Sequence, residues 1–451
     1  MIWRRPRRCR RWPAWQARYS AGGRRTAGQR LPRPAEVVAS RCPAPVSTPL
    51  CRRNTDVAAY SDDGTNGRRL TEDEIFAAHE GGKLSTGLPF AIHDQRALAT
   101  AYTPGVAQVS RAIAGDETLA AQYTWANRLV AVVSDGSAVL GLGDIGPRAA
   151  LPVMEGKSAL FKSFAGLDSI PLVLDTDDVD EIVETLVRLR PTFGAVNLED
   201  ISAPRCFELE QRVVEALDCP VMHDDQHGTA IVVLAALRGA CLTLGRDLAR
   251  LRIVITGAGA AGVACAKILL AAGVKDVTVL DSRGILHTGR THLNPIKEGL
   301  AAQTNPEGRS GGLSDALVGA DALIGVSSAL VPEDVVATMK PDGIVFALSN
   351  PDPEITPEVA ARHAAVVATG RSDYPNQINN VLAFPGLFKG ALDADARYIS
   401  EGMKLAAADA IVSVAAGQLS VDHIVPEALD PRVAPAVAEA VAEAAHRDGI
   451  T

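Results

Sequence analysis

Two aspartates stand side by side in the segment MHDDQHGTA, residues 222–230. Asp224 and Asp225 each make ionisation of the other harder unless a positive group lies between them. One explanation is a divalent cation held by either aspartate together with Glu199 and Asp200, since hard oxygen donors suit Mg²⁺ or Mn²⁺. The other is that both aspartates cap the following helix, where acids favour the N-terminal end of the dipole. The residues alone leave both explanations open.

Two histidines flank this aspartate pair. His223 and His227 are four positions apart, a spacing that two zinc ligands use on one face of a helix. The pattern is HDDQH rather than HExxH, it spans the expected end of a strand, and no third ligand is evident. We therefore favour histidines that make ordinary hydrogen bonds over a zinc hydrolase.

A glycine-rich turn, GAGAAG at residues 257–262, follows the apolar run RIVIT and precedes an expected helix. The next expected strand, VTVLD, ends at Asp281, and this arrangement is typical of a dinucleotide-binding βαβ unit. The backbone of the turn would approach the pyrophosphate at the N-terminus of the helix. The residues expected to bind the cofactor there are Gly257, Gly259, Ala260 and Gly262.

Asp281 is the residue that bears on the choice of cofactor. Its carboxylate would accept hydrogen bonds from the ribose 2′-hydroxyl and repel a 2′-phosphate, which favours NAD over NADP. Arg283 lies two residues further on, and its guanidinium could hold a 2′-phosphate. We therefore expect NAD, with NADP as the alternative.

Short apolar runs alternate with helical patterns along most of the chain, and this alternation predicts an α/β fold with parallel sheets. The carboxylates of NLED and HDD follow expected strands, at the edge where such sheets build their sites. We expect strands at 129–133, 170–175 and 195–200, and helices at 153–165, 178–189, 204–217, 228–244, 402–417 and 434–446. Three parts are expected: a basic disordered extension at 1–60, an N-terminal α/β domain that holds the carboxylates at 61–226, and a Rossmann-type dinucleotide-binding domain with C-terminal helices at 227–451.

The charge is unevenly distributed. Residues 1–53 contain fourteen Arg, no Lys and one acid, whereas the whole chain has a net charge of −8. The remainder is therefore strongly acidic and should repel nucleic acid, so we expect no nucleic-acid partner. The basic head lacks the apolar core of a secretory signal; an organelle transit peptide or a start codon assigned too far upstream are alternatives to a disordered head.

The seven cysteines show no CxxC pair, which suits reduced thiols in a cytoplasmic protein. No run of about 18 uncharged apolar residues occurs, and the strongest apolar stretch, 231–237, is too short to cross a bilayer. We therefore expect no membrane span.

With these segments in hand, the chain resembles the malic enzymes, in particular the compact bacterial type. The resemblance covers roughly residues 70 to 445, and its motifs occur in family order. The matching words are AYTPGVA (101–107), VVSDGSAVLGLGDIGP (132–147), PVMEGKSALFK (152–162), NLEDI (197–201), HDDQHGTA (223–230), GAGAAG (257–262), LSNP (348–351) and NQINNVLAFPG (376–386).

This resemblance implies oxidative decarboxylation of L-malate to pyruvate and CO₂, with reduction of NAD(P) and dependence on Mg²⁺ or Mn²⁺. It favours the metal explanation of the acids and implies a homodimer or homotetramer. By motif it assigns metal ligands to Glu199, Asp200 and Asp225 with Asp224 beside them, a general acid to Tyr102, a general base to Lys157, and substrate contacts to Asn350 and Asn380.

Lys157 could serve as a base only if burial and the charge of the metal lowered its pKa from about 10.4 toward neutrality.

Two other functions remain as alternatives. A malolactic-type decarboxylase would use nearly the same residues. A non-catalytic NAD-binding regulatory protein would need no metal site, and an amino-acid dehydrogenase would have no use for the carboxylates.

Overall fold

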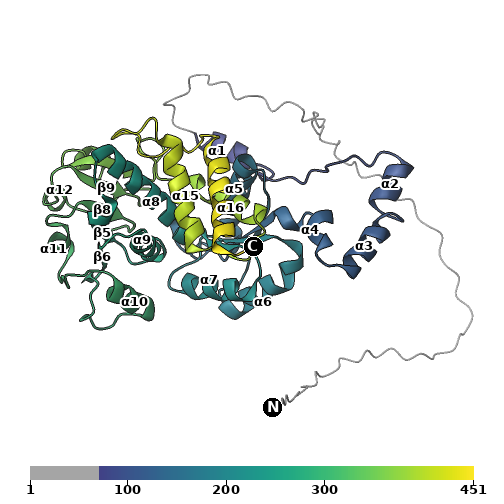
Figure 1. Ribbon diagram of the computed structural model, residues 1–451, viewed down its shortest axis with the longest axis horizontal. Helices are drawn as coiled ribbons and strands as arrows, with labels where there is room; N and C mark the ends of the chain where they lie inside the picture. The colour runs from purple at the N-terminus through teal and green to yellow at the C-terminus, as the bar shows by residue number, and fades with distance from the viewer. Residues whose placement is uncertain (1–70) are drawn as a thin grey trace, which may run out of the picture. The chain divides into compact units, whose positions relative to one another are not determined.

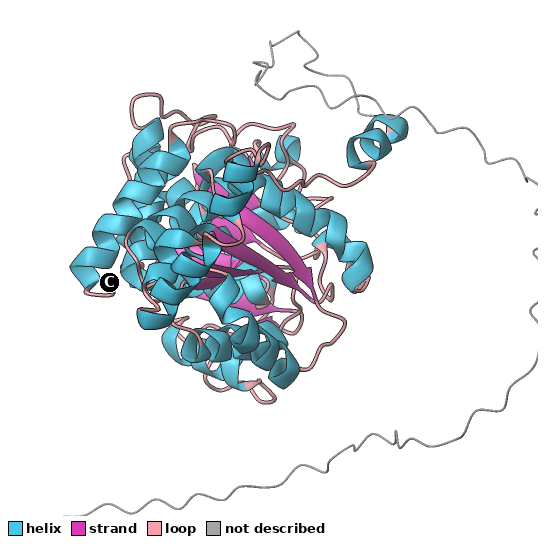
Figure 2. Ribbon diagram, turned by 90° about the vertical axis from the view of Figure 1, so that its right-hand side faces the viewer, coloured by secondary structure: helices cyan, strands magenta, loops and turns pink. Residues whose placement is uncertain are grey.

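The computed structural model describes residues 71–451. The predicted extension at 1–60 lies outside this range. Within it, strands gather in the interior and helices surround them (Figure 2). The predicted α/β class is confirmed, and the strands form two separate sheets.

The first sheet has four parallel strands in the order β2-β1-β3-β4. Its central strand β1 is a β-branched run, LVAVVS, in which every residue is buried, as expected for a parallel sheet covered on both faces. The strands are β1 (Leu129–Ser134), β2 (Asp168–Val173), β3 (Ala195–Leu198) and β4 (Val221–His223), and the helices between them are α5 (Pro147–Ala165), α6 (Val179–Leu189) and α7 (Arg205–Ala216).

The second sheet has six strands in the order β10-β9-β8-β5-β6-β7, and only β7 runs antiparallel to its neighbour among the described strands. The strands are β5 (Arg252–Thr256), β6 (Asp276–Asp281), β7 (Gly284–Ile285), β8 (Ala322–Gly325), β9 (Gly343–Ala347) and β10 (Ala364–Thr369). Its connecting helices are α9 (Ala260–Ala271), α10 (Pro295–Gln303), α11 (Leu313–Leu317), α12 (Glu333–Val336) and α13 (Pro357–Ala360).

Helix α8 (Asp224–Leu244) leads from β4 of the first sheet to the second. It packs against α9 and α15 (Glu401–Ala415), and α15 in turn packs against α16 (Val433–Asp448) and α14 (Phe384–Asp393) (Figure 1). Helix α8 is the one described helix long and apolar enough to span a membrane, but 67% of its apolar window is buried inside the fold. These properties are those of a core helix, and the predicted domain boundary at 226/227 falls within it.

The N-terminal helices differ from the rest. They are α1 (Glu72–His79), α2 (Gln95–Ala101), α3 (Val106–Gly115) and α4 (Leu119–Tyr123), and no residue between 71 and 128 is buried. Thr71 and Glu74 form a capping box at the start of α1. Large apolar side chains are nevertheless exposed here, among them Phe76 at 69% and Leu88 at 74%. This segment therefore presents apolar surface that residues 71–451 leave uncovered.

Several predicted boundaries were wrong, and the strand expected at 195–200 ends at Leu198. The helix expected from 153 begins at Pro147, because proline is favoured in the first turn and the preceding Gly146 adopts a φ of 77° that starts the turn. The strand expected at 170–175 lies at 168–173. The helix expected from 228 begins at Asp224, so the paired aspartates lie in its first turn instead of a preceding loop.

Candidate active site

Three acids meet at the carboxyl edge of the first sheet. Glu199 and Asp200 follow β3, and Asp225 lies in the first turn of α8, just after the neighbouring strand β4. One ligand atom from each of the three lies within 4.8 Å of the others. The backbone N–H of Asp200 donates to Oδ2 of Asp225 at 2.8 Å. Adjacent parallel strands thus bring together carboxylates that are about 25 residues apart in sequence.

Asp224 has a different environment from Asp225. It is fully buried, and its Oδ2 accepts hydrogen bonds from Nζ of Lys157 at 2.6 Å and from Nδ2 of Asn380 at 3.1 Å. A side chain at Gly228 would collide with its other oxygen, so glycine is required there. The helix cap residue is His223, and it makes no side-chain cap bond. Neither aspartate is the cap residue, but both lie in the first turn of the helix, where acids are favoured, and Asp224 also binds Lys157.

Lys157 bridges the two groups of acids. Its Nζ lies 2.9 Å from Oε1 of Glu199 as well as 2.6 Å from Asp224. Burial lowers the pKa of this ammonium, but the charges of Asp224 and Glu199 outweigh burial and raise the pKa above its ordinary value. Burial and the charge of a metal would have to lower this pKa before Lys157 could act as a base, because the two carboxylates alone keep the proton on the amine.

The same neighbours act on Glu199. Burial raises its pKa, Lys157 opposes this, and the carboxylates of Asp225, Asp224 and Asp200 raise it further. Glu199, Asp200 and Asp224 are buried, and Lys157 pairs only with Glu199 and Asp224. This excess of buried negative charge is costly without a further cation. The donor set of hard oxygens and this charge balance fit a magnesium or manganese ion held by Glu199, Asp200 and Asp225.

An aromatic side chain that the sequence did not single out completes the surroundings of Lys157. The Nζ atom lies 4.2 Å from the centre of the Phe384 ring, and Phe161 packs edge-on against the same ring at 4.8 Å. Such a cation–π contact fixes the position of the amine. Phe384 lies in the quoted segment NQINNVLAFPG, and nothing in the residue pattern distinguishes it from a core phenylalanine.

Asn380 and Asn350 differ in what they contact. Asn380 binds Asp224, and its Oδ1 accepts from the Thr229 hydroxyl at 3.2 Å, so it lies at the acid cluster. Asn350 is exposed on the loop after β9 and makes no hydrogen bond with the cluster in the described part of the chain. Its predicted contact with substrate stays a prediction.

Tyr102 is not at this site. It caps the C-terminus of α2, is 66% exposed, and its hydroxyl makes no hydrogen bond with any residue in 71–451. The general acid predicted at this position stays a prediction.

The histidines lie beside the acid cluster and outside its ligand set. Nε2 of His227 is 3.1 Å from Oε2 of Glu210, and its Nδ1 is 3.3 Å from Nζ of Lys404. His223 is fully buried, with Nε2 3.7 Å from Asp225. His227 therefore makes the hydrogen bonds that were expected, whereas both ring nitrogens of His223 are buried without a hydrogen-bond partner in the described part of the chain.

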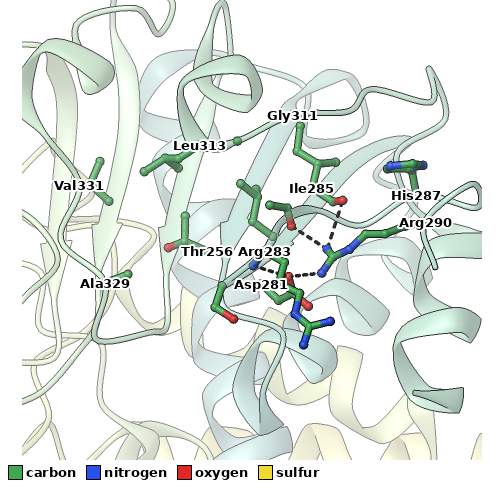
Figure 3. Close-up of a pocket in the computed structure, with 14 residues that line it drawn as sticks. Thr256, Asp281, Arg283, Ile285, His287, Arg290, Gly311, Leu313, Ala329 and Val331 are labelled. Atoms are coloured by element: carbon green, nitrogen blue, oxygen red, sulfur yellow. Dashed lines mark hydrogen bonds and ion pairs between the residues drawn. The ribbon is translucent and has the colours of Figure 1, made fainter. Parts of the chain in front are cut away.

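The glycine turn lies at the carboxyl end of β5. Gly257 has a φ of 119°, and Gly259 is the N-cap of α9, which begins at Ala260. A side chain at Gly262 would collide with the carbonyl of Gly257, so the helix approaches the strand closely. Asp281 ends the adjacent strand β6 and lines a cavity of about 580 Å³ (Figure 3).

Comparison with known proteins agrees with this geometry. The N-terminal domain model of malic enzymes matches residues 83–214, and the malic enzyme NAD binding domain model matches residues 226–446. The chain belongs to the malic enzyme family. The resemblance stated from the motifs is thereby confirmed. Strands β1 to β3 of the first sheet lie in the N-terminal match, β4 falls between the two matches, and the second sheet lies in the NAD-binding match.

Individual malic enzymes are similar over most of the chain. An NAD-dependent malic enzyme from Geobacillus stearothermophilus is 52% identical, over 84% of this chain and 80% of its own. A bifunctional malic/malolactic enzyme from Bacillus subtilis is 51% identical, over 82% of this chain and 91% of its own. The crystal structure of a malic enzyme from Pyrococcus horikoshii has a TM-score of 0.81 and 43% identity, over 84% of this chain and 91% of its own.

Proposed function

We propose that this protein catalyses the oxidative decarboxylation of L-malate to pyruvate and CO₂, with reduction of NAD or NADP and dependence on Mg²⁺ or Mn²⁺. The observation that supports this most strongly is the joint placement of three oxygen ligands and a buried lysine at one sheet edge. Hydroxy-acid oxidation needs both a site for a cation and a group that takes the hydroxyl proton.

Each residue has a defined task in this proposal. Glu199, Asp200 and Asp225 would hold the divalent ion, which when bound supplies polarisation of the substrate C2 oxygen. Lys157 takes the proton of the C2 hydroxyl while hydride leaves C2 for the nicotinamide. Lys157 must be neutral to do so. Asp224 and Glu199 raise its pKa, and a cation bound at Glu199 would offset part of this negative charge.

Tyr102 and the uncovered helices suggest how the site is completed. We infer a homodimer in which residues 71–128 are covered by a second copy, because large apolar side chains of a folded segment are unstable in water. Tyr102 then protonates C3 after CO₂ leaves, in a site whose lysine is Lys157 of the partner subunit.

The four buried, unpaired thiols among the described residues support a cytoplasmic location.

The experiment is a turnover assay with the full chain. L-malate is supplied with NAD or NADP, with Mn²⁺ or with EDTA, and reduced nicotinamide, pyruvate and lactate are measured together. Equal amounts of reduced cofactor and pyruvate that disappear with EDTA are expected. Lactate without net cofactor reduction would identify malolactic chemistry, and nucleotide binding without any product would identify a regulatory protein.

A further inference from the structure

The strand order of the second sheet reverses at β5. This strand pairs with β6 on one side and with β8 on the other, and β9 lies beyond β8 (Figure 1). In an open parallel sheet, a dinucleotide binds across the carboxyl ends of the strands at such a reversal. Asp281 marks the adenosine end of this crevice at β6. The loops after β8 and β9 therefore border the opposite end, where the nicotinamide of the cofactor would lie.

The loop after β8 lies directly against the glycine turn. A side chain at Gly257 would collide with the carbonyl of Val326, the first residue after β8. The backbone N–H of Val326 also donates to the carbonyl of Thr256 at 3.0 Å. The position of this loop therefore sets the shape of the crevice next to the turn that is expected to bind the pyrophosphate.

Glu354 joins the loops after β8 and β9. It is only 2% exposed. Its Oε1 accepts from the backbone N–H of Ser327 at 2.9 Å, and its Oε2 accepts from that of Ser349 at 3.1 Å. Its own carbonyl accepts from the backbone N–H of Val331 at 2.8 Å. One residue thus holds the loop after β8 at two points and the loop after β9 at its start.

The end of β8 is shaped to receive this carboxylate. A side chain at Gly325, the last residue of β8, would collide with the carboxyl group of Glu354. Burial raises the pKa of Glu354, and the backbone N–H groups of Ser327 and Ser349 oppose this rise. A buried acid is costly unless hydrogen bonds satisfy it, and here both oxygens are used to bind backbone N–H groups of two different loops.

The loop after β9 also meets the half of the chain that holds the acids. A side chain at Gly141 would collide with the carbonyl of Asn350, the residue that follows Ser349. Gly141 lies in the short helix η2 (Leu140–Leu142), which precedes α5, the helix that carries Lys157. The loops that Glu354 joins therefore lie against the glycine turn on one side and against the segment before α5 on the other.

We propose that Glu354 is a positioning residue for hydride transfer, which joins the loops after β8 and β9 so that they hold the nicotinamide end of the cofactor in place beside the substrate. This inference rests on the proposed function, because it concerns how the same site places its cofactor. Glu354 is buried and acts through the backbone of Ser327 and Ser349. Glutamine at this position would turn an amide donor toward one of these backbone donors, so Glu354→Gln releases one of the two loops.

The decisive measurement compares the binding of NADH and of 5′-AMP to the full chain by calorimetry, without malate or metal. NADH contains the AMP unit and adds the nicotinamide half. Glu354→Gln is expected to weaken NADH binding about tenfold and to change 5′-AMP binding by less than about twofold. Gly325→Ala displaces the same carboxylate without removing it, and the same result is expected.

Two control variants match these changes. Glu358→Gln replaces an exposed glutamate on α13, and Gly417→Ala adds a methyl group that meets no atom within 4 Å. Both controls should bind NADH and 5′-AMP as wild type does. If Glu354→Gln and Gly325→Ala keep the wild-type ratio of the two affinities, the inference is wrong. A general loss of folding would lower both affinities together and would count against it in the same way.

Turnover gives a second measure of the same effect. With L-malate deuterated at C2, the primary isotope effect on kcat/KM should be larger in Glu354→Gln than in wild type, because hydride transfer to a poorly held ring limits the rate. A lowered kcat/KM with an unchanged isotope effect would contradict the inference. Because NADH binding needs no malate, an absence of malate turnover in wild type would contradict the proposed function alone.

Discussion

The Nζ atom of Lys157 lies 2.6 Å from Oδ2 of Asp224, and both side chains are buried although they are 67 residues apart in sequence. Asp224 is not one of the three acids whose ligand atoms lie within 4.8 Å of one another, so the two neighbouring aspartates have different surroundings. Asp224 positions Lys157, and Asp225 faces Glu199 and Asp200.

Replacing Lys157 by alanine should remove the proton acceptor from the site. We expect malate oxidation to fall by about 10²- to 10⁴-fold, the usual contribution of a general base, with NAD binding retained. The matched control is Lys162→Ala on the same helix, since Lys162 pairs with Asp168 at the opposite end of the sheet and is 62% exposed. Turnover preserved in the Lys157 variant would exclude it as the base.

Asp225→Asn should weaken metal binding. The substitution removes one charge from the acid cluster and keeps the side-chain volume, so we expect the affinity for Mn²⁺ to fall about tenfold or more. Calorimetric titration with Mn²⁺ alone measures this without reference to activity. Asp180→Asn is the control, because the Asp180 side chain on α6 is exposed. This variant should bind Mn²⁺ with the affinity of wild type. Unchanged affinity in the Asp225 variant would remove it from the ligand set.

Two inactive variants should restore activity when they are combined. In the proposed homodimer, a mixed dimer of Tyr102→Phe and Lys157→Ala contains one intact site made from two chains. We expect each variant alone to be nearly inactive and the mixture, after dissociation and reassociation, to recover about a quarter of wild-type turnover, because half of the dimers are mixed and each has one working site of two. If mixed dimers form and the mixture is still as inactive as each variant alone, the active site is not built from residues of two chains.

Glu210 should stabilise the fold in a pH-dependent way. Burial opposes its ionisation, but the attraction and hydrogen bond of His227, with the backbone N–H of His223, lower its pKa from 4.5 to about 2. A carboxylate whose pKa is lower in the folded than in the unfolded protein stabilises the fold at pH values above its unfolded pKa. For Glu210 this contribution is lost as the pH falls from about 4.5 toward 2. This contribution is at most about 3 kcal/mol and is fully present only where the attracting imidazoles are charged.

Urea unfolding of Glu210→Gln tests this contribution. The free energy of unfolding should be lower than in wild type by up to this amount at pH 7, and the difference should shrink below pH 4.5. Glu208→Gln on the same helix changes an exposed side chain. It should leave the free energy of unfolding nearly unchanged both at pH 7 and below pH 4.5. If the free energy of unfolding of Glu210→Gln were below that of wild type by the same amount at every pH, the loss would not come from the charge of Glu210.

The described cysteines should be unreactive in the folded protein. Burial raises the pKa of the Cys206 and Cys265 thiols to about 12 and those of Cys219 and Cys241 to about 11, so little thiolate forms at pH 8. Iodoacetamide with peptide mapping should label none of these four until denaturant is added. Rapid labelling of any of them in the native protein would show that its surroundings open readily.

The residues alone determined the fold class, the glycine turn and the acids at the sheet edge. These features are local: a strand, a turn and a helix form from neighbouring residues, and their order predicts a βαβ unit with Asp281 at its end. Parallel strands share a carboxyl edge, so NLED and HDD could be expected to meet there before the structure was known.

Only the tertiary structure decided what each of these acids does. Asp224 binds Lys157 and Asn380, which are 67 and 156 residues away, and Asp281 binds two cations in place of standing free. The direction of the Lys157 pKa shift and the exposure of Tyr102 were likewise fixed by packing. The physical reason is that electrostatic energy depends on distance in space and on burial, whereas hydrophobic periodicity in a sequence describes only the order of neighbours along the chain.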